Sequence, residues 1–234
     1  MPLHGWVRIL LECQKIRQFY PLLQPSSSSR NPNEQAYSNR GLNLSESRWN
    51  KFYGNQGLLR CNLRVKYEEY RILWGRQELN RDRAKYSHRE GETDTLCSYC
   101  SQEEETEVHL YTNCMVTNVF WKKAAQWYEQ TFHVKVPLGL KIPRILGMDN
   151  ERSSDLRNIF YRNARYCIYF NRRKSLIPSL EYFVTLVKDE LKRKYSGSRL
   201  AKHSQNQAET AAIHWLQSQM GWLSHSQTLQ AKPN

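Results

Sequence analysis

Four side chains that commonly bind metal ions lie close together in the sequence, between Leu96 and Trp121. They are Cys97, Cys100, His109 and Cys114, with the spacing Cys-x2-Cys-x8-His-x4-Cys. Two cysteines separated by two residues suit a tight turn, or knuckle, that points both sulfurs at one ion, and the later His and Cys can complete a tetrahedron. Zinc accepts three thiolates and one imidazole in structural sites. The spacing therefore predicts one structural zinc ion, with no coordination position left open for water.

The competing interpretation is that these residues simply pack in the core, because cysteine often behaves as a small buried hydrophobe and histidine can be a satisfied interior residue. Three of the six cysteines, Cys13, Cys61 and Cys167, lie outside the cluster, and we interpret them as core thiols. A disulfide framework is disfavoured because the chain is large and shows no secretory signal. Clustered Cys and His residues in intracellular proteins usually bind metal, which favours zinc and a nuclear or cytoplasmic protein that is not secreted.

The window resembles the zinc-binding segment found downstream of the reverse transcriptase domain in LINE-type (non-LTR) retrotransposon polyproteins. That family pattern is a Cys-x-x-Cys pair, an acidic run, a His-Leu pair, a third Cys and an aromatic helix with a Trp. The matching residues here are Cys97 and Cys100, Glu103 to Glu105, His109-Leu110, Cys114, and Phe120-Trp121. Where the family often has an acidic residue directly before the His, this chain has Val108, which leaves the ligand set intact.

The resemblance extends over about residues 60 to 220. Tyr70-Arg71-Ile72-Leu73 lies where such elements carry a similar helix, and Ile145-Leu146-Gly147 and Arg165-Tyr166-Cys167-Ile168-Tyr169 resemble the helical segment that follows. The resemblance implies a region that helps a polymerase engage its RNA template or target DNA. It also adds association with a reverse transcriptase to the expected partners.

The chain is strongly basic, with 35 Lys and Arg against 22 Asp and Glu and a net charge of +13. This charge favours a polyanionic partner, either RNA or DNA or an anionic membrane surface. No apolar run reaches the length of a membrane span. The predicted partner is RNA or DNA, and neither a membrane nor a small-molecule substrate is expected.

Cations are densest in the C-terminal part of the chain, where interspersed tyrosines could add stacking on unpaired bases. The predicted nucleic-acid-binding residues are Arg157, Arg162, Arg165, Arg172, Arg173, Lys174, Lys192, Arg193 and Lys194. Two alternatives stay open. The binding face could lie on the basic segment from Arg60 to Lys85, or the cations could be solvated charges on helix surfaces without a role in binding.

Apolar residues at three- to four-residue steps predict helices over 58–86, from Cys114 to Phe132, and over 153–172, 178–195 and 199–220. Because no segment shows sustained two-residue alternation, the predicted fold is all-α, an irregular helical domain organised around a single Cys3His zinc knuckle. Residues 1–57 are expected to be a poorly ordered extension with one candidate helix and a Ser/Pro-rich linker. Residues 58–222 would form the zinc-binding domain and residues 223–234 a disordered tail.

Two features inside this domain allow alternative interpretations. Trp121 and Trp127 could stack on bases, but aromatic residues at helical spacing more often belong to the core, which is the favoured interpretation. The acidic run from Glu103 to Glu105 would repel phosphate, so any nucleic-acid face is expected elsewhere on the domain.

The sequence lacks the motifs of the catalytic machinery that the resemblance might bring with it. The Tyr/Phe-x-Asp-Asp strand of a polymerase, a phosphate-binding Gly-rich loop and a His-Glu-x-x-His helix do not occur. Acidic and basic candidates for a nuclease lack the expected strand context and are interpreted as helix-surface charges; they are Asp149, Asp155, Asp189, Glu190 and Lys192. We therefore predict a non-catalytic, zinc-binding and nucleic-acid-binding module. The alternatives are a zinc-stabilised protein-interaction scaffold or a truncated retroelement copy without independent function.

Overall fold

The computed structural model describes residues 44, 45, 47, 48, 61–73, 77–86, 94–149, 155–195 and 207–219. All of these residues belong to one compact unit, Leu44–Asn234. The predicted domain boundaries at 57/58 and 222/223, the N-terminal extension up to residue 43 and the C-terminal tail lie outside the described residues.

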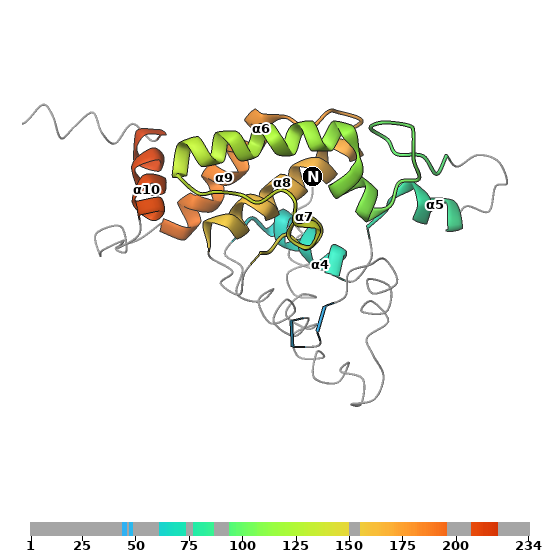
Figure 1. Ribbon diagram of the computed structural model, residues 1–234, viewed down its shortest axis with the longest axis horizontal. Coiled ribbons are helices and arrows are strands. Elements are labelled where there is room, and N and C mark those ends of the chain that lie inside the picture. Colours follow the sequence, from blue (N-terminus) through green and yellow to red (C-terminus); the bar gives the residue numbers. More distant parts are fainter. Residues whose placement is uncertain are drawn as a thin grey trace, which may run out of the picture. The chain divides into compact units, whose positions relative to one another are not determined.

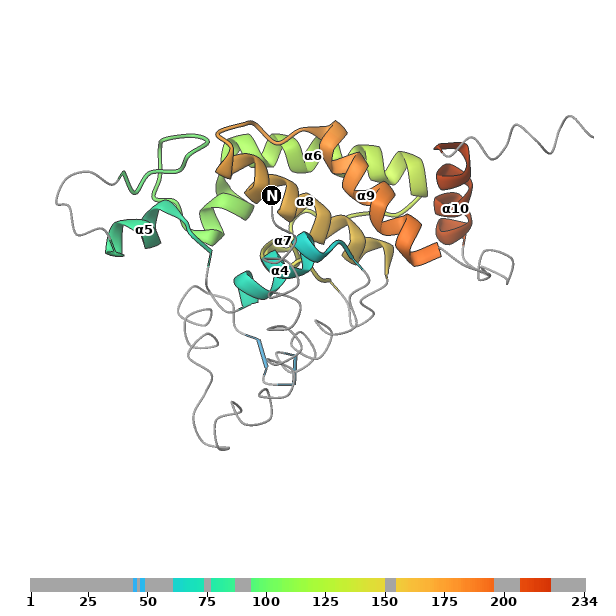
Figure 2. The same cartoon turned by 180° about the vertical axis from the view of Figure 1, so that it is seen from behind.

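The described part of the chain is helical (Figures 1 and 2). Its helices are α4 (Leu63–Leu73), α5 (Asn80–Tyr86), the π-helix η2 (His109–Asn113), α6 (Met115–Phe132), α7 (Lys141–Leu146), α8 (Leu156–Arg173), α9 (Leu180–Tyr195) and α10 (Gln207–Gln219). Within these residues the only β-pairing is an isolated antiparallel bridge between Leu96 and Glu104. The prediction of an all-α fold is confirmed for this part of the chain. None of its helices combines the length and apolarity needed to cross a membrane.

Helix boundaries differ from the prediction at two places. The segment 58–86 was expected to be one helix, but it contains two, α4 and α5, with a non-helical stretch at 77–79. No helix was predicted between Phe132 and residue 153, but the short helix α7 forms there at Lys141–Leu146. Pro143 is the third residue of α7, where its missing N–H has no intrahelical acceptor to lose.

The predicted helices α8 and α9 form close to the expected positions. Asp155 caps α8, because its carboxylate accepts a hydrogen bond of 2.8 Å from the N–H of Arg157. Capping of this kind satisfies one of the N–H groups that a helix leaves without a partner at its start.

Helix α8 lies at the centre of the fold, with α4, α6, α7 and α9 packed against it (Figure 1). Nearly all of its side chains are buried, although its sequence is rich in arginine and asparagine. A helix covered on all sides usually has apolar residues on all sides. The polar residues of α8 must therefore find partners inside the protein.

Three arginines of α8 find those partners in glutamates from three different elements. Their side chains are 5% exposed or less. The pairs are Arg162 with Glu190 of α9 at 2.5 Å, Arg165 with Glu69 of α4, and Arg172 with Glu105 of the segment before η2. Each pair attaches one neighbouring element to the central helix.

This arrangement corrects part of the predicted nucleic-acid interface. Arg162, Arg165 and Arg172 were expected to contact phosphates, but all three are buried and neutralised by carboxylates. Withdrawing such a guanidinium would leave its glutamate buried without a counter-charge, which is costly. We therefore remove these three residues from the interface.

An aromatic cluster fills the space between α6, α8, α9 and α10. Trp121 of α6 is fully buried and lies 5.7 Å from the ring of Phe160 of α8, which confirms its interpretation as a core residue. Trp127 is half-buried and packs edge-to-face on Phe183 of α9 and Trp215 of α10. Such edge-to-face pairs are a favourable arrangement of aromatic rings, and they attach α10 to the rest of the domain.

Gly147 ends α7 directly against one of the buried ion pairs. Its φ of +74° lies in the left-handed region that favours glycine. A Cβ added here would lie 2.8 Å from Nη2 of Arg165 and 3.0 Å from Oε1 of Glu69. The position therefore combines a backbone restriction with a steric one.

We predict that Gly147→Ala destabilises the protein by about 2–4 kcal/mol, because it adds left-handed strain and displaces the Arg165–Glu69 pair. Urea unfolding of the purified chain measures the effect. Gly139→Ala is the matched control, since its added Cβ meets no atom within 4 Å, and it should cost less than about 0.5 kcal/mol. Equal stability of the two variants would contradict the prediction.

Candidate metal centre

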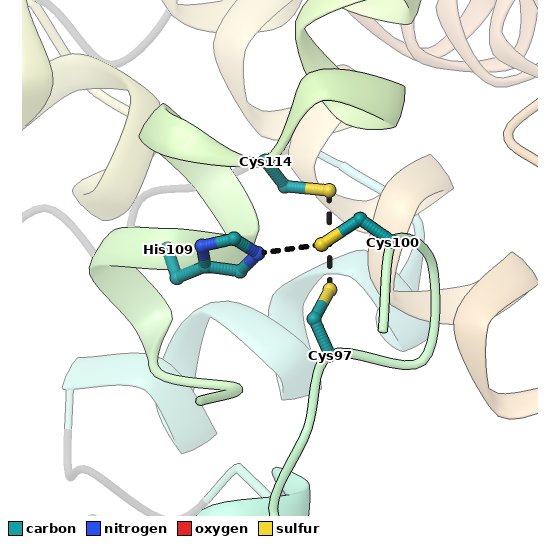
Figure 3. A group of neighbouring side chains, drawn as sticks. All are labelled: Cys97, Cys100, His109 and Cys114. Atoms are coloured by element: carbon teal, nitrogen blue, oxygen red, sulfur yellow. Dashed lines mark hydrogen bonds between the residues drawn. The ribbon is translucent and has the colours of Figure 1, made fainter. Parts of the chain in front are cut away.

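The side chains of the four predicted ligands point toward one another (Figure 3). The two sulfurs of Cys97 and Cys114 are 3.8 Å apart, and the sulfur of Cys100 lies 3.2 Å from Nε2 of His109. All four ligand atoms lie within 4.8 Å of one another, close enough to hold a metal ion. A zinc ion with Zn–S bonds of about 2.3 Å places two tetrahedral sulfur ligands about 3.8 Å apart. The donor set and its spacing thus fit a tetrahedral ion.

A short loop presents the first two cysteines. We call residues 95–105 the metal loop. The N–H of Cys97 donates to the carbonyl of Glu103, and the N–H of Ser101 donates back to the carbonyl of Cys97, both at 2.8 Å. Ser101 adopts a positive φ of 52°, which lets the chain reverse tightly. The N–H of Tyr99 also points at the sulfur of Cys97, at 3.5 Å.

The π-helix η2 presents the other two ligands. In this helix the N–H of Cys114 donates to the carbonyl of His109 at 2.8 Å, a bond that spans five residues instead of four. Residues five apart lie on different faces of an ordinary α-helix. The wider π-turn brings them to the same side, so the His-x4-Cys spacing points both candidate ligands at one place. Single π-turns often occur at functional sites.

Cys114 is placed to act as a thiolate. Its pKa is lowered to about 5, because Cys97 donates a hydrogen bond to its sulfur and the N–H groups of Val116 and Thr117, at the start of α6, also point at it. The pKa of Cys97 is raised, because the proton it donates to Cys114 is held there and because the thiol is buried. A metal ion bound here would displace the proton that Cys97 donates to Cys114.

Glu103 orients the histidine ligand. Its Oε2 lies 2.8 Å from Nδ1 of His109, on the opposite side of the ring from the sulfurs. A carboxylate in this position holds the proton on Nδ1, so that Nε2 is free to bind a metal. From the sequence, Glu103 was expected only as part of an acidic turn, because spacing alone does not indicate which carboxylate faces the imidazole.

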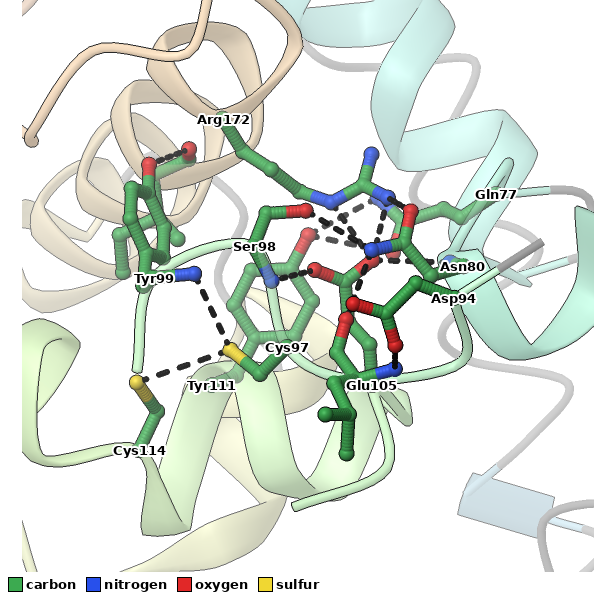
Figure 4. A network of polar contacts seen from close by, with 12 residues as sticks. Gln77, Asn80, Asp94, Cys97, Ser98, Tyr99, Glu105, Tyr111, Cys114 and Arg172 are labelled. Carbon is green, nitrogen blue, oxygen red and sulfur yellow. Dashed lines mark hydrogen bonds and ion pairs between the residues drawn. The ribbon is translucent and has the colours of Figure 1, made fainter. Parts of the chain in front are cut away.

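Glu105 ties the metal loop to two helices (Figure 4). Its side chain is fully buried and accepts hydrogen bonds from the N–H of Asn80 at 2.9 Å, the N–H of Ser98 at 2.8 Å and Nε of Arg172 at 2.7 Å. Burial by itself would raise the pKa of this carboxyl, but the contacts with Arg172 outweigh it and the pKa is lowered. We call Asn80, Ser98, Glu105 and Arg172 the Glu105 network.

Asn80 completes this network from the start of α5. Its Nδ2 donates to the carbonyl of Leu96 at 2.7 Å and to Oγ of Ser98 at 3.0 Å, while its Oδ1 accepts from Arg172 at 2.9 Å. The two residues that it contacts in the loop flank Cys97. The position of the first metal ligand therefore depends on α5 and α8.

A tyrosine makes a second anchor between the metal loop and α8. The hydroxyl of Tyr99 donates to the carbonyl of Ile168 at 2.7 Å, and burial raises the pKa of this tyrosine. Cys167 lies beside this contact but is not a fifth ligand, since it is not part of the cluster. Burial raises the pKa of Cys167, and likewise that of Cys61, to about 12. The interpretation of these two as core thiols is confirmed, and Cys13 lies outside the described residues.

Five of the six remaining cations of the predicted interface form two groups. Arg173 and Lys174 are exposed at the C-terminal end of α8, whereas Lys192, Arg193 and Lys194 lie at the C-terminal end of α9. A short turn joins α8 to α9 and the two helices pack together, so these groups lie at opposite ends of the pair. Helix α8, with 18 residues, is about 27 Å long, which is roughly the distance between the two groups. Arg157, at the start of α8, forms an ion pair of 3.0 Å with Asp149.

The acidic residues considered for a nuclease also have structural partners. Asp149 and Asp155 both contact Arg157, and Glu190 binds Arg162 and Nδ2 of Asn163 inside the fold. The interpretation of these residues as surface charges is therefore wrong for Glu190, which is buried.

We predict that Cys97→Ser or Cys114→Ser abolishes stoichiometric zinc and unfolds the metal loop, because binding energy at such a site is folding energy. Metal analysis and amide hydrogen exchange of the loop measure both effects. Cys61→Ala and Cys167→Ala are the controls and should keep one zinc per chain. Well-folded wild-type protein without zinc would contradict the prediction.

We also predict that Glu103→Ala weakens zinc binding about 10- to 100-fold, because His109 loses the carboxylate that fixes its ring. Competition with a chromophoric chelator measures the affinity. Glu104→Ala removes a neighbouring exposed carboxylate and should leave the affinity unchanged. If both variants bind zinc equally, Glu103 has no orienting role.

Comparison of the chain with protein-family models, with curated proteins and with solved structures gives no match. The resemblance to LINE-type polyproteins therefore depends on the sequence motifs alone. The chemistry of the site follows from its own geometry, which provides four donor atoms able to hold a metal ion.

Proposed function

We propose that this chain is a non-catalytic module that binds one structural zinc ion and nucleic acid, similar to the region downstream of a LINE-type reverse transcriptase. One observation carries the proposal. The Glu105 network neutralises Arg172 beside the metal loop, while the next two residues, Arg173 at the end of α8 and Lys174 directly after it, stay exposed to solvent. The metal loop and the two exposed cations, Arg173 and Lys174, thus lie at the C-terminal end of α8.

Zinc is the metal that suits these ligands best. Thiolates are soft ligands, and a set of three thiolates with one imidazole is typical of closed structural zinc sites. The metal loop has little apolar core of its own, so an ion that joins it to η2 would supply much of its stability. This supports a single knuckle that organises this end of the domain.

The surface charge supports a polyanionic partner. With a net charge of +13, the chain has far more cations than its internal ion pairs use. Arg173 and Lys174 are adjacent and exposed, which suits contacts with neighbouring phosphates.

A protein-interaction scaffold is the second candidate, because of two apolar residues in the turn between α8 and α9. Leu176 is 54% exposed and Ile177 is 73% exposed. Side chains of this kind can anchor a protein partner in a pocket. The two functions predict different responses to salt, since phosphate contacts release counterions and apolar contacts do not.

We predict that the zinc-loaded full chain binds single-stranded RNA or DNA. The logarithm of the binding constant should fall linearly with the logarithm of the salt concentration, with a slope of about 0.7 for each contacted phosphate. Fluorescence anisotropy over a series of salt concentrations measures the slope. Protein stripped of zinc should bind more weakly, because the loop next to Arg173 loses its support. Absence of salt-dependent binding to either nucleic acid would contradict the proposed function and favour the scaffold.

A further inference from the structure

Three rings on α8 and α9 are stacked almost parallel. Tyr166 and Phe170 lie 5.7 Å apart with an angle of 23° between their rings, and Phe170 and Tyr182 lie 5.0 Å apart at 27°. Among the described residues, the aromatic pairs of the core are instead tilted by 48° or more. The parallel stack therefore differs in geometry from the core. Tyr166 is buried, but Phe170 and Tyr182 are half-buried and reach the surface.

A cation lies against this stack. Nζ of Lys174 lies 4.4 Å from the ring centre of Phe170. Burial raises the pKa of Tyr166, while its hydrogen bond with Tyr182 and the nearby charges of Arg64 and Arg173 oppose that rise. Arg173 follows Phe170 by three residues on α8, and Arg64 precedes Tyr67 by three residues on α4; residues three apart lie on the same side of a helix.

Helix α4 adds an exposed ring to this side. Tyr67 is 54% exposed, and the guanidinium of Arg71 lies 5.8 Å from its ring centre. The same guanidinium lies 5.8 Å from the ring of Tyr169, which in turn lies 6.0 Å from the guanidinium of Arg172. Alternating rings and cations thus connect exposed Tyr67 with the Glu105 network beside the metal loop.

We infer that this side of the domain, the α4–α8 face, binds an unpaired strand of RNA or DNA, with bases stacked on its exposed rings and phosphates on its cations. The α4–α8 face consists of Arg64, Tyr67, Phe170, Arg173, Lys174 and Tyr182. The inference rests on the proposed function and specifies the form of nucleic acid and where it binds.

Charge and ring geometry together select this ligand. Three carboxylates lie near the face. Glu68 is buried and lies 3.5 Å from Arg71, Glu78 is exposed and lies 3.0 Å from Arg71, and Glu181 is exposed in the first turn of α9. The three exposed cations of the face, Arg64, Arg173 and Lys174, outnumber the two exposed carboxylates. Flat rings can stack on bases of any sequence, but only where the bases are unpaired, and cations beside the rings suit the backbone.

The test uses the zinc-loaded full chain and an unstructured RNA of about 12 nucleotides, with the same sequence as a duplex for comparison. Tyr67→Leu should weaken binding of the single strand about tenfold without changing the salt slope, because it removes stacking and no charge. Tyr67→Trp should restore the affinity. Zinc content and unfolding curves show that each variant is folded.

A double charge reversal tests the cations. Arg173→Glu with Lys174→Glu should flatten the salt slope by about 1.4, since each lost phosphate contact removes about 0.7. Lys122→Glu with Lys123→Glu is the matched control, with the same change in net charge at exposed positions of α6. Helix α6 lies on the opposite side of α8 from α4 in both views (Figures 1 and 2). This control should keep most of the slope.

The outcomes separate the two proposals. If wild-type protein binds the single strand but Tyr67→Leu and the α8 double variant bind equally well, the α4–α8 face is wrong and the proposed function stands. Equal affinity for duplex, together with no effect of Tyr67→Leu, would also overturn the inference. If wild-type protein binds no nucleic acid, the proposed function itself fails.

Discussion

The fold depends on burying a polar helix. Helix α8 lies among four other helices, and its three interior arginines can remain there only because Glu190, Glu69 and Glu105 neutralise them. An unpaired charge in such a position would cost several kcal/mol. Each glutamate comes from a different element, so the pairs fix which neighbours pack on α8. Apolar helix surfaces could pack on α8 in several registers. A buried arginine allows only the register that brings its carboxylate partner within contact distance.

The third of these pairs links the fold to the candidate metal centre. Glu105 binds Arg172 and, in the same network, the N–H of Ser98 between the first two ligands. Tyr99 adds a bond to the backbone of α8. The domain thus holds the metal loop on one side, and the candidate ligands His109 and Cys114 face it on the other. A bound metal ion and helix α8 would both stabilise the metal loop. The loop in turn would help to position the exposed C-terminal end of α8.

Much of the site could be predicted from sequence because it is local. Its four ligands lie within 18 consecutive residues, so short turns and one helix are enough to bring them together. Glu103 could not be assigned in the same way, because any of the three successive glutamates from Glu103 to Glu105 could face the imidazole. The turn geometry decides between them: it directs Glu103 to His109, Glu104 to solvent and Glu105 into the interior.

The sequence by itself determined the four candidate metal ligands, the all-α class, the positions of α6, α8 and α9, and the role of Trp121 in the core. Periodicity and spacing are local properties, and these features depend on them. Only the tertiary structure decided which cations face solvent. Arg162 and Arg172 meet glutamates 28 and 67 residues away in the chain, and no local pattern identifies such partners. A run of arginines on one helix therefore looks like a charged surface in the sequence, although the fold divides it between the interior and the solvent.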